Sequence, residues 1–228
     1  MAALGISSSN IKAYYRMASA FFALEKLSEA ATACNAGLTV NPTNSSLLVL
    51  QAKVTQKQGL IDKKEKKQQE EQDKKRRIAE MLAQALKVRK IRTRNTGQPP
   101  EMKDAVIRLL PDPLSLKSTL SFPVMILYPL HLQSDFIKAF GEEQTLQGHL
   151  EYLLPSPWDT ADQYQPTAVD AYMETMTGGL IRWGKKVELL KVLSAGKVEV
   201  VDGLVRVNIV PQARASEWIE AFKNRRIK

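Results

Sequence analysis

The stretch IKAYYRMASAFFALEKLSEAATACNAGLTVNPTN, residues 11–44, decides the fold of the first part of this 228-residue chain. Apolar side chains recur at helical spacing in its first half. In its second half the small residues Ala30, Ala33 and Gly37 share one face, together with Cys34. Pro42 follows and cannot continue a helix. The stretch therefore predicts two short helices that cross at small residues, which is a helical hairpin.

The length of the stretch, 34 residues, equals the period of a tetratricopeptide repeat. Counted from Ile11, the large and small residues of that repeat fall where expected, at Tyr14, Met17, Ala18, Phe21, Ala30, Cys34, Gly37 and Pro42. Gly37 replaces the usual alanine, and we expect it to loosen the second helix slightly because glycine is a poor helix former.

Residues 45–94 predict a long charged helix that begins after a cap at Asn44, Ser45 or Ser46. Its middle, DKKEKKQQEEQDKKRR at residues 62–77, holds no apolar side chain and cannot be buried. Acids precede bases at i,i+4 spacing, and each such pair supports a helix by about 0.2–0.5 kcal/mol. The segment therefore predicts a solvated spacer with apolar ends, in which Gly59 is the weakest point.

Residues 95–228 predict an α+β domain with a mainly antiparallel sheet, because strand and helix patterns alternate irregularly. We expect strands at residues 120–129 and 168–175, a strand hairpin at 197–211 that turns at Asp202–Gly203, helices at 134–140 and 142–154, and a final helix at 216–226 capped by Ser216. Residues 180–193 fit a strand or a helix. The expected organisation is therefore 1–44 repeat, 45–94 spacer and 95–228 α+β domain.

The formal net charge of +9 belongs to the spacer. Residues 53–94 hold 15 Lys and Arg against 6 Asp and Glu, and the rest of the chain is balanced. Two interpretations stay open: a solvated helix, or a surface for an acidic partner or RNA. The second would use the least compensated cations, which are Arg76, Arg77, Arg89, Lys90, Arg92 and Arg94.

Lys12 and Arg16 lie one helical turn apart on the first predicted helix. Two cations at this spacing can grip a carboxylate through charge-assisted hydrogen bonds, and the guanidinium adds a planar fork. The alternative is that both are solvated surface residues, which is the ordinary state of an isolated pair. Their spacing alone leaves both interpretations open.

Several classes of function lack support in the sequence. His131 and His149 have no metal-ligand spacing, and no nucleophile elbow G-x-S-x-G is present. The longest apolar run, residues 123–130, is too short to cross a bilayer, and the single Cys34 excludes an intrachain disulfide. We expect no catalytic residues, no metal, no cofactor and no membrane partner, and a location in the cytoplasm, with the nucleus as a second compartment.

KAYYR followed by ALEKLSEA resembles the third repeat of carboxylate-clamp tetratricopeptide domains. That resemblance implies that Lys12 and Arg16 bind the acidic EEVD-type C-terminus of heat-shock chaperones. LSFPVMILYPLHLQSDFI, LLPSPWD, VDGLVRVNIVP and EWIEAF resemble the C-terminal "wheel" domain of a co-chaperone family. Its fungal member is called cyclophilin seven suppressor, and its animal counterpart is called tetratricopeptide repeat protein four.

The resemblance implies a co-chaperone adaptor without enzymatic activity, whose partner is the ninety-kilodalton heat-shock chaperone and, as a second candidate, the seventy-kilodalton one. The family has three repeats before the wheel domain, and this sequence has the last. We therefore expect a sequence shortened at its N-terminus or a genuine short form, in which Lys12 and Arg16 alone bind an EEVD peptide poorly. The alternative function is an RNA- or ribosome-associated factor that acts through the basic helix.

Overall fold

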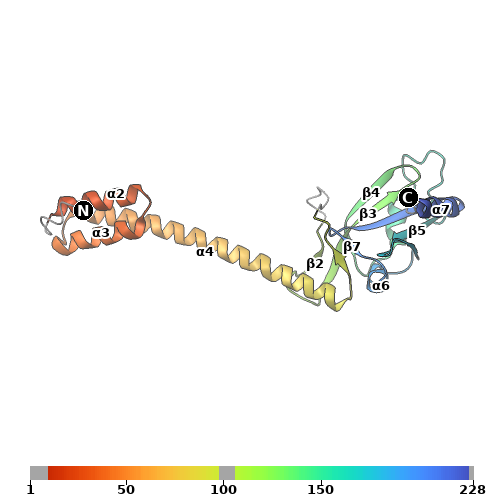
Figure 1. Cartoon of the computed structure of the whole chain (residues 1–228), viewed down its shortest axis with the longest axis horizontal. Coiled ribbons are helices and arrows are strands. Elements are labelled where there is room, and N and C mark those ends of the chain that lie inside the picture. Colours follow the sequence, from red (N-terminus) through yellow and green to blue (C-terminus); the bar gives the residue numbers. More distant parts are fainter. Residues whose placement is uncertain (1–9, 98–105, 226–228) are drawn as a thin grey trace. The chain divides into compact units, whose positions relative to one another are not determined.

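The computed structural model describes residues 10–97 and 106–225. Its helices are α2 (Ile11–Ala23), α3 (Leu27–Val40), α4 (Ser45–Val88), α5 (Leu146–Leu153), α6 (Leu189–Ser194), the short 3-10 helix η1 (Gln212–Arg214) and α7 (Ala215–Asn224) (Figure 1). Its strands are β1 (Thr93–Arg94), β2 (Arg108–Leu110), β3 (Thr119–Tyr128), β4 (Gln133–Gly141), β5 (Val169–Glu174), β6 (Leu180–Trp183), β7 (Val200–Val201) and β8 (Val205–Pro211). The α+β fold class predicted from the sequence is confirmed.

The chain forms two compact units, Met1–Lys75 and Arg76–Lys228. The division falls inside the polar middle of α4, residues 62–77, which holds no apolar side chain. We therefore describe each unit by itself.

The first unit is the predicted hairpin, closed by the start of α4. Between α2 and α3 the chain reverses at Glu25, whose φ is 58°. The core of the unit consists of small and medium side chains from three helices, namely Ala18, Ala33, Cys34, Leu47 and Leu50. Small residues let helices approach closely, so the pattern of residues 11–44 and the packing agree.

Gly37 lies where α3 approaches α2 and α4 closely. A Cβ atom built there would lie 2.7 Å from Leu47 Cδ1 and 2.9 Å from Tyr14 Cβ. The glycine therefore allows α2 and α4 to pack against α3, and the expectation that it merely loosens α3 misses this role.

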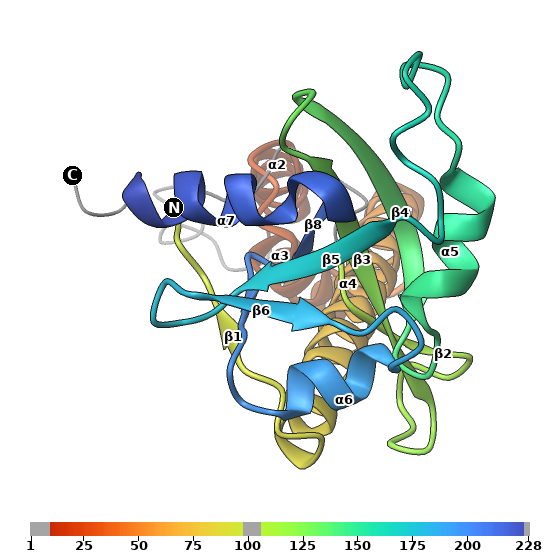
Figure 2. The same cartoon turned by 90° about the vertical axis from the view of Figure 1, so that its right-hand side faces the viewer.

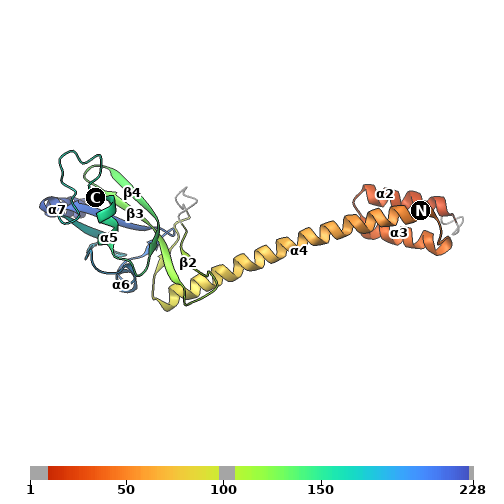
Figure 3. The ribbon, with the colours of Figure 1, turned by 180° about the vertical axis from the view of Figure 1, so that it is seen from behind.

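Helix α4 begins with the cap that the sequence offered and is unbroken at Gly59 (Figure 3). Asn44 Oδ1 accepts a hydrogen bond of 3.0 Å from the backbone N–H of Leu47, which satisfies a donor of the first turn. In the second unit, Met81, Leu82 and Ala85 near the end of α4 pack into the core of the sheet.

The second unit is built on a sheet with the strand order β2-β3-β8-β5-β6, to which β4 is added by pairing with β3. Every pair in this sheet is antiparallel except β3–β8. A separate short pair, β1–β7, is parallel. The mainly antiparallel sheet predicted from the sequence is confirmed.

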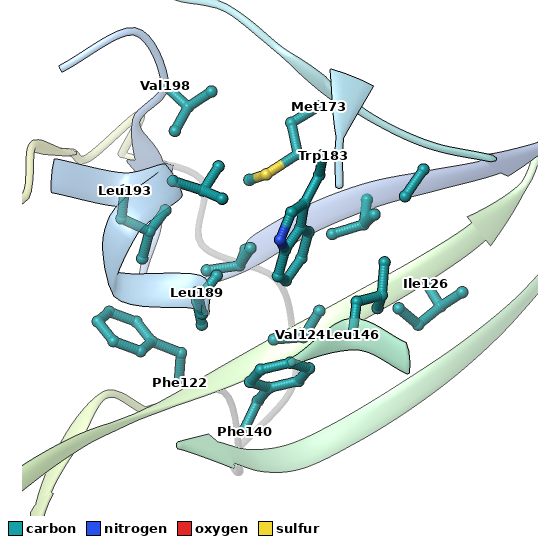
Figure 4. Packing of buried hydrophobic residues seen from close by; sticks show 14 of the residues in the cluster. Phe122, Val124, Ile126, Phe140, Leu146, Met173, Trp183, Leu189, Leu193 and Val198 are labelled. Carbon is teal, nitrogen blue, oxygen red and sulfur yellow. The ribbon is translucent and has the colours of Figure 1, made fainter. Parts of the chain in front are cut away.

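One face of the sheet carries the main core (Figure 4). Trp183 is 1% exposed, and its indole donates a 2.9 Å hydrogen bond to the carbonyl of Val187. Phe122, Val124 and Phe140 from β3 and β4 share this core with Leu146 of α5 and Leu189 and Leu193 of α6. Alternate residues of each strand point into it, as a pleated sheet requires.

The opposite face of the sheet is covered in part by α7 (Figure 2). Trp218 of this helix packs with Tyr172 of β5 and Val210 of β8, and Ile219 and Phe222 join the same cluster. Helix α7 begins at Ala215, so Ser216 lies inside its first turn and the predicted cap at Ser216 is wrong. The predicted apolar stripe of this helix is confirmed.

The helix expected at residues 134–140 is wrong, because this segment is strand β4. Its register with β3 runs from Tyr128↔Gln133 to Ser121↔Gly141. Phe140 reaches the core and Asp135 accepts a 2.8 Å hydrogen bond from the hydroxyl of Tyr128. A ten-residue strand beside it offers backbone partners along the whole segment, and this tertiary context overrides local helical preference.

The hairpin expected at residues 197–211 is only partly present. Asp202 and Gly203 form the turn, with φ values of 53° and 75° as a primed turn requires. The strands on either side, however, find other partners: β7 pairs with β1, and β8 pairs with β3 and β5. Residues 180–193, which fit either element, divide at Gly184 into β6 and α6.

Candidate functional site

Helix α2 places Lys12 and Arg16 on one exposed face of the first unit. The helix starts at Asn10, whose Oδ1 accepts a 3.2 Å hydrogen bond from the N–H of Ala13. Both cations line one hollow of 570 Å³, together with Asn10, Ala13, Met17, Ala20, Phe21 and Leu24. The structure therefore brings the two predicted site residues together on one surface.

In the part of the chain that the structure describes, the fold uses neither cation of this hollow. Among the described residues, no ion pair or hydrogen bond is formed by the side chain of Lys12 or Arg16. Both side chains are exposed, so their charges are available to a ligand. Met17, Phe21 and Leu24 supply apolar surface beside them. The hollow can accept a carboxylate and an apolar side chain next to it.

A second hollow of 310 Å³ lies on the surface shared by α2 and α3. It is lined by Met17, Phe21, Ser28, Glu29, Thr32, Ala33 and Ala36. Met17 and Phe21 line both hollows. The sequence MAALGISSS, residues 1–9, resembles the tail of a preceding helix followed by a loop, and these residues lie outside the described part of the chain.

The basic residues predicted as an alternative contact surface have different environments. Arg76 and Arg77 are exposed in α4, and Arg76 Nε lies 3.8 Å from the carboxylate of Glu80. Arg89 is built into the fold: its Nε lies 2.7 Å from Oε2 of Glu142, a side chain that is 3% exposed. Arg89 also donates a 2.8 Å hydrogen bond to the carbonyl of Ser118. We therefore leave Arg89 out of any proposed contact surface.

The last three residues of that group follow the end of α4. Lys90 is exposed and has a φ of 57°, which reverses the chain as the helix stops. Arg92 donates a 3.6 Å hydrogen bond to the sulfur of Met176, and Arg94 pairs with Glu199 at 2.9 Å. Only the tertiary structure reveals these acceptors, because Glu142, Met176 and Glu199 lie far along the chain from their arginines.

The described residues include no group of three or more His, Cys, Asp or Glu side chains placed to hold a metal ion. His131 instead lies among aromatic rings, with Nδ1 3.1 Å from the hydroxyl of Tyr164. His149 stacks on Phe140, and burial lowers the pKa of its imidazole. Over the same described ranges, no helix combines the length and the apolar character that a bilayer crossing requires.

The fold and the site define a class of protein with two parts. One part is a tetratricopeptide-type hairpin with cations on its first helix. The other is an α+β unit with a mainly antiparallel sheet, one face of which is partly covered by the final helix. A family model described as the Cns1/TTC4 Wheel domain matches residues 112–222. A solved structure of "Hsp90 co-chaperone Cns1 from Saccharomyces cerevisiae (delta69)" matches 96% of this chain and 73% of its own with a TM-score of 0.87 and 32% identity. The chain belongs to the Cns1/TTC4 family.

Two curated relatives extend this similarity to the sequence. The protein named "Hsp70/Hsp90 co-chaperone cns1" of Schizosaccharomyces pombe is 37% identical over 220 residues, which cover 95% of this chain and 61% of the relative. "Hsp70/Hsp90 co-chaperone CNS1" of Saccharomyces cerevisiae is 32% identical over 228 residues, which cover 96% of this chain and 59% of the relative. This chain therefore spans about three fifths of the length of these relatives.

Proposed function

We propose that the chain acts as a co-chaperone adaptor in which Lys12 and Arg16 hold the acidic EEVD-type C-terminus of the ninety-kilodalton heat-shock chaperone. The seventy-kilodalton chaperone is the second candidate, because both names occur in the descriptions of the fungal relatives. The second unit then presents a folded surface to a client or to the chaperone itself. The proposal includes no enzymatic step, and it places the protein in the cytoplasm.

The observation that carries this proposal is the pair of unused cations in one hollow. An EEVD tail ends in two carboxylates, one from the aspartate side chain and one from the chain terminus. Lys12 and Arg16 are exposed, lie one turn apart and line the same 570 Å³ hollow. Charge-assisted hydrogen bonds to carboxylates are roughly twice as strong as neutral ones. Two such groups on one helix face therefore favour an acidic chain end over a neutral one.

We expect the affinity to be low. Two exposed cations meet a ligand in water, where ion pairs contribute about 0–1 kcal/mol each. The resemblance implies further clamp residues on two other repeats, and residues 10–97 contain the last repeat alone. A dissociation constant well above micromolar follows for an isolated EEVD peptide.

An NMR titration of the full chain with acetylated MEEVD peptide tests the proposal. We expect amide shifts confined to α2 and its hollow, and their loss in Lys12→Ala with Arg16→Ala. Lys53→Ala is the matched control, because Lys53 is an exposed lysine of α4 outside this hollow. A micromolar constant lost on Lys12→Ala would show that the clamp is complete, against our expectation. Binding that survives the double substitution would exclude this site.

The alternative, an RNA- or ribosome-associated factor, has weaker support. Of its six cations, Arg89 and Arg94 pair with carboxylates, and Arg76 lies near Glu80. The two functions differ in their dependence on salt. Binding through phosphates weakens steeply as salt rises, with a slope that counts the phosphates contacted, and it ignores an EEVD competitor.

A further inference from the structure

Lys185 holds the end of the segment that leads into β5. Residues 155–168, all described, join α5 to β5 and form neither helix nor strand, and we call them the strap (Figure 2). Lys185 follows the edge strand β6, and its Nζ donates hydrogen bonds to the backbone carbonyls of Pro166 at 2.5 Å and Thr167 at 3.3 Å. Hydrogen bonds from a charged donor are roughly twice as strong as neutral ones. The ammonium of Lys185 therefore fastens two consecutive residues of the strap to the sheet.

The strap covers an aromatic cluster at the turn between β3 and β4. Its Trp158 and Tyr164 pack against the ring of Tyr128, with ring centroids 4.8 and 5.3 Å away. The same two rings lie 5.4 and 5.3 Å from the ring of His131. Tyr128 and Tyr164 are fully buried. Opening of the strap would therefore remove two of the rings that cover Tyr128 and His131 and would expose an aromatic surface.

The closed strap contains a buried group that its surroundings do not satisfy. Oδ2 of Asp159 accepts a 2.6 Å hydrogen bond from the N–H of Tyr164. Oδ1 of the same carboxylate is buried and has no hydrogen-bond partner among the described residues. A buried acceptor without a partner has lost its hydration and has gained no hydrogen bond in return, which is unfavourable. The closed state therefore depends on other contacts of the strap to offset this cost.

The end of the strap has both charged and uncharged contacts. Gln212 supplies uncharged ones, from its backbone N–H to the carbonyl of Ala168 at 2.8 Å and from Nε2 to the carbonyl of Thr167 at 3.4 Å. Lys185 supplies the charged donor. Loss of that charge would leave the end of the strap to the neutral contacts, which are weaker.

The charged groups near Lys185 are paired with each other. Asp170 of β5 and Arg182 of β6 form an ion pair at 2.6 Å. Partial burial lowers the pKa of the Lys185 ammonium, while Asp170 raises it and Arg182 lowers it. In the ranges that the structure describes, Lys185 itself forms no ion pair, and its side chain is only partly buried. The carbonyls of the strap are thus the groups that lose a partner when Lys185 is neutralised.

We propose that Lys185 is a charge-dependent latch that keeps the strap closed, and that neutralising it opens the strap and exposes Tyr128 and His131. Acetyl transfer from a thioester is a modification that would do this. The amine nitrogen attacks the thioester carbonyl, an amide bond forms and the C–S bond breaks. Of the two protons that the ammonium loses, one joins the thiolate and one goes to solvent. The acetylated nitrogen has no charge and keeps one of its three N–H donors.

Hydrogen exchange of the full chain, followed by NMR, tests the latch. Lys185→Gln removes the charge, and we expect the amides of Tyr164 and Ala168 to exchange at least about tenfold faster. Lys185→acetyl-lysine, introduced by codon suppression, should give the same result. Lys185→Arg keeps the charge and should stay within about threefold of the unmodified chain. Lys186→Gln is the matched control, because Lys186 is the next residue and is exposed, and it should change exchange by less than about twofold.

Fluorine NMR of the chain labelled with 5-fluorotryptophan distinguishes opening of the strap from unfolding. The sequence has three tryptophans. Trp158 lies in the strap, Trp183 in the main core and Trp218 in α7. In Lys185→Gln we expect the resonance of Trp158 to shift while those of Trp183 and Trp218 keep their positions.

Any of three results would overturn the proposal. Exchange in the strap that stays within about twofold in Lys185→Gln would mean that other contacts hold it closed. Equal acceleration by Lys186→Gln would indicate a general effect of charge. A joint shift of all three tryptophan resonances would mean that Lys185 supports the whole second unit. Strap and latch lie in that unit, Arg76–Lys228, so the outcome does not depend on Lys12 and Arg16.

Discussion

Cations serve different purposes in the two units of this protein. On α2 of the first unit, Lys12 and Arg16 are exposed and unpaired among the described residues. In the second unit, Arg89 lies between Glu142 and the Ser118 carbonyl, and Arg94 pairs with Glu199. Lys12 and Arg16 are thus exposed cations without an ion pair among the described residues, whereas Arg89 and Arg94 are paired within the fold. Availability depends on what surrounds a cation in space, so a run of charge along the sequence does not identify a binding surface.

Arg89 illustrates the physical basis of this difference. Its side chain is 16% exposed and that of Glu142 is 3% exposed, so both charges have lost most of their water. Burial of a charge is costly unless a partner and hydrogen bonds replace the lost hydration. Glu142 Oε1 also accepts a 2.8 Å hydrogen bond from the N–H of Leu120. The pair therefore joins the residue after α4 to β3 and to the segment between β4 and α5.

The largest effect should come from breaking this pair. Arg89→Ala leaves the carboxylate of Glu142 buried without its cation, and we expect the free energy of unfolding of the second unit to fall by about 3 kcal/mol. Urea unfolding followed by tryptophan fluorescence measures this, because Trp158, Trp183 and Trp218 all lie in the second unit.

Two further variants sharpen that measurement. Arg92→Ala is the control and should cost less than about 0.5 kcal/mol, since Arg92 is an exposed arginine. Arg89→Met combined with Glu142→Gln removes both charges but keeps an acceptor for Leu120, and it should recover part of the loss. A cost below about 1 kcal/mol for Arg89→Ala would mean that the pair is not structural.

Two glycines allow the packed interior of the first unit to be compared with an exposed part of α4. Gly37→Ala places a Cβ 2.9 Å from Tyr14 Cβ, so overpacking should outweigh the gain in helix propensity and destabilise the hairpin by about 1 kcal/mol. Gly59→Ala meets no atom within 4 Å and should stabilise its helix by about 0.5–1 kcal/mol.

Hydrogen exchange of the backbone amides measures both effects, in α3 for Gly37→Ala and around residue 59 for Gly59→Ala. Opposite signs are the expected result. Stabilisation by both substitutions would show that α2 and α4 do not approach α3 as closely as the distances of 2.7 and 2.9 Å at Gly37 imply.

Acid should loosen the contact between residue 96 and the turn at Asp202. Hydrogen bonds from the side chain and backbone of Thr96 hold the pKa of the Asp202 carboxyl below its usual value of 3.8. A lowered pKa in the folded protein means that the contact contributes fully above pH 3.8 and is lost as the pH falls through the lower folded value.

The amide proton shift of Thr96, followed by NMR from pH 6 to pH 2, reports this contact. We expect a transition whose midpoint lies below pH 3.8, and its disappearance in Asp202→Asn. A midpoint above that value would mean that the hydrogen bonds do not stabilise the ionised carboxylate.

The smallest effect on stability should come from the free cations of α2. Lys12→Ala and Arg16→Ala remove charges that form no hydrogen bond or ion pair with a described residue, so each should change the free energy of unfolding by less than about 0.5 kcal/mol. Circular dichroism during thermal unfolding measures this. A large destabilisation would place these side chains among the structural cations and remove the contrast with Arg89.

The hairpin, the long helix after it and the α+β class could be predicted because each depends on local patterns. Spacing of small and large residues in 11–44 defines two amphipathic faces, and Asn44 is a cap by its chemistry and position. The positions of Lys12 and Arg16 on one face follow from the same helical geometry. Local rules were sufficient here because residues a few positions apart determine the outcome.

The errors occurred where the deciding contacts are distant in the sequence. Residues 134–140 are a strand because β3 supplies a complete hydrogen-bonding partner, and Ser216 is not a cap because α7 starts one residue earlier, directly after η1. The runs on either side of Asp202–Gly203 prefer partners from elsewhere over each other.

The sequence by itself determined the helical hairpin, the paired cations on its first helix and the solvated middle of α4, because helix periodicity and charge act over a few residues. The tertiary structure alone decided which arginines are structural. Arg89 and Glu142 are 53 residues apart, and Arg94 and Glu199 are 105 apart. Such pairs exist only after the sheet has folded, because burial and strand pairing bring their partners within reach.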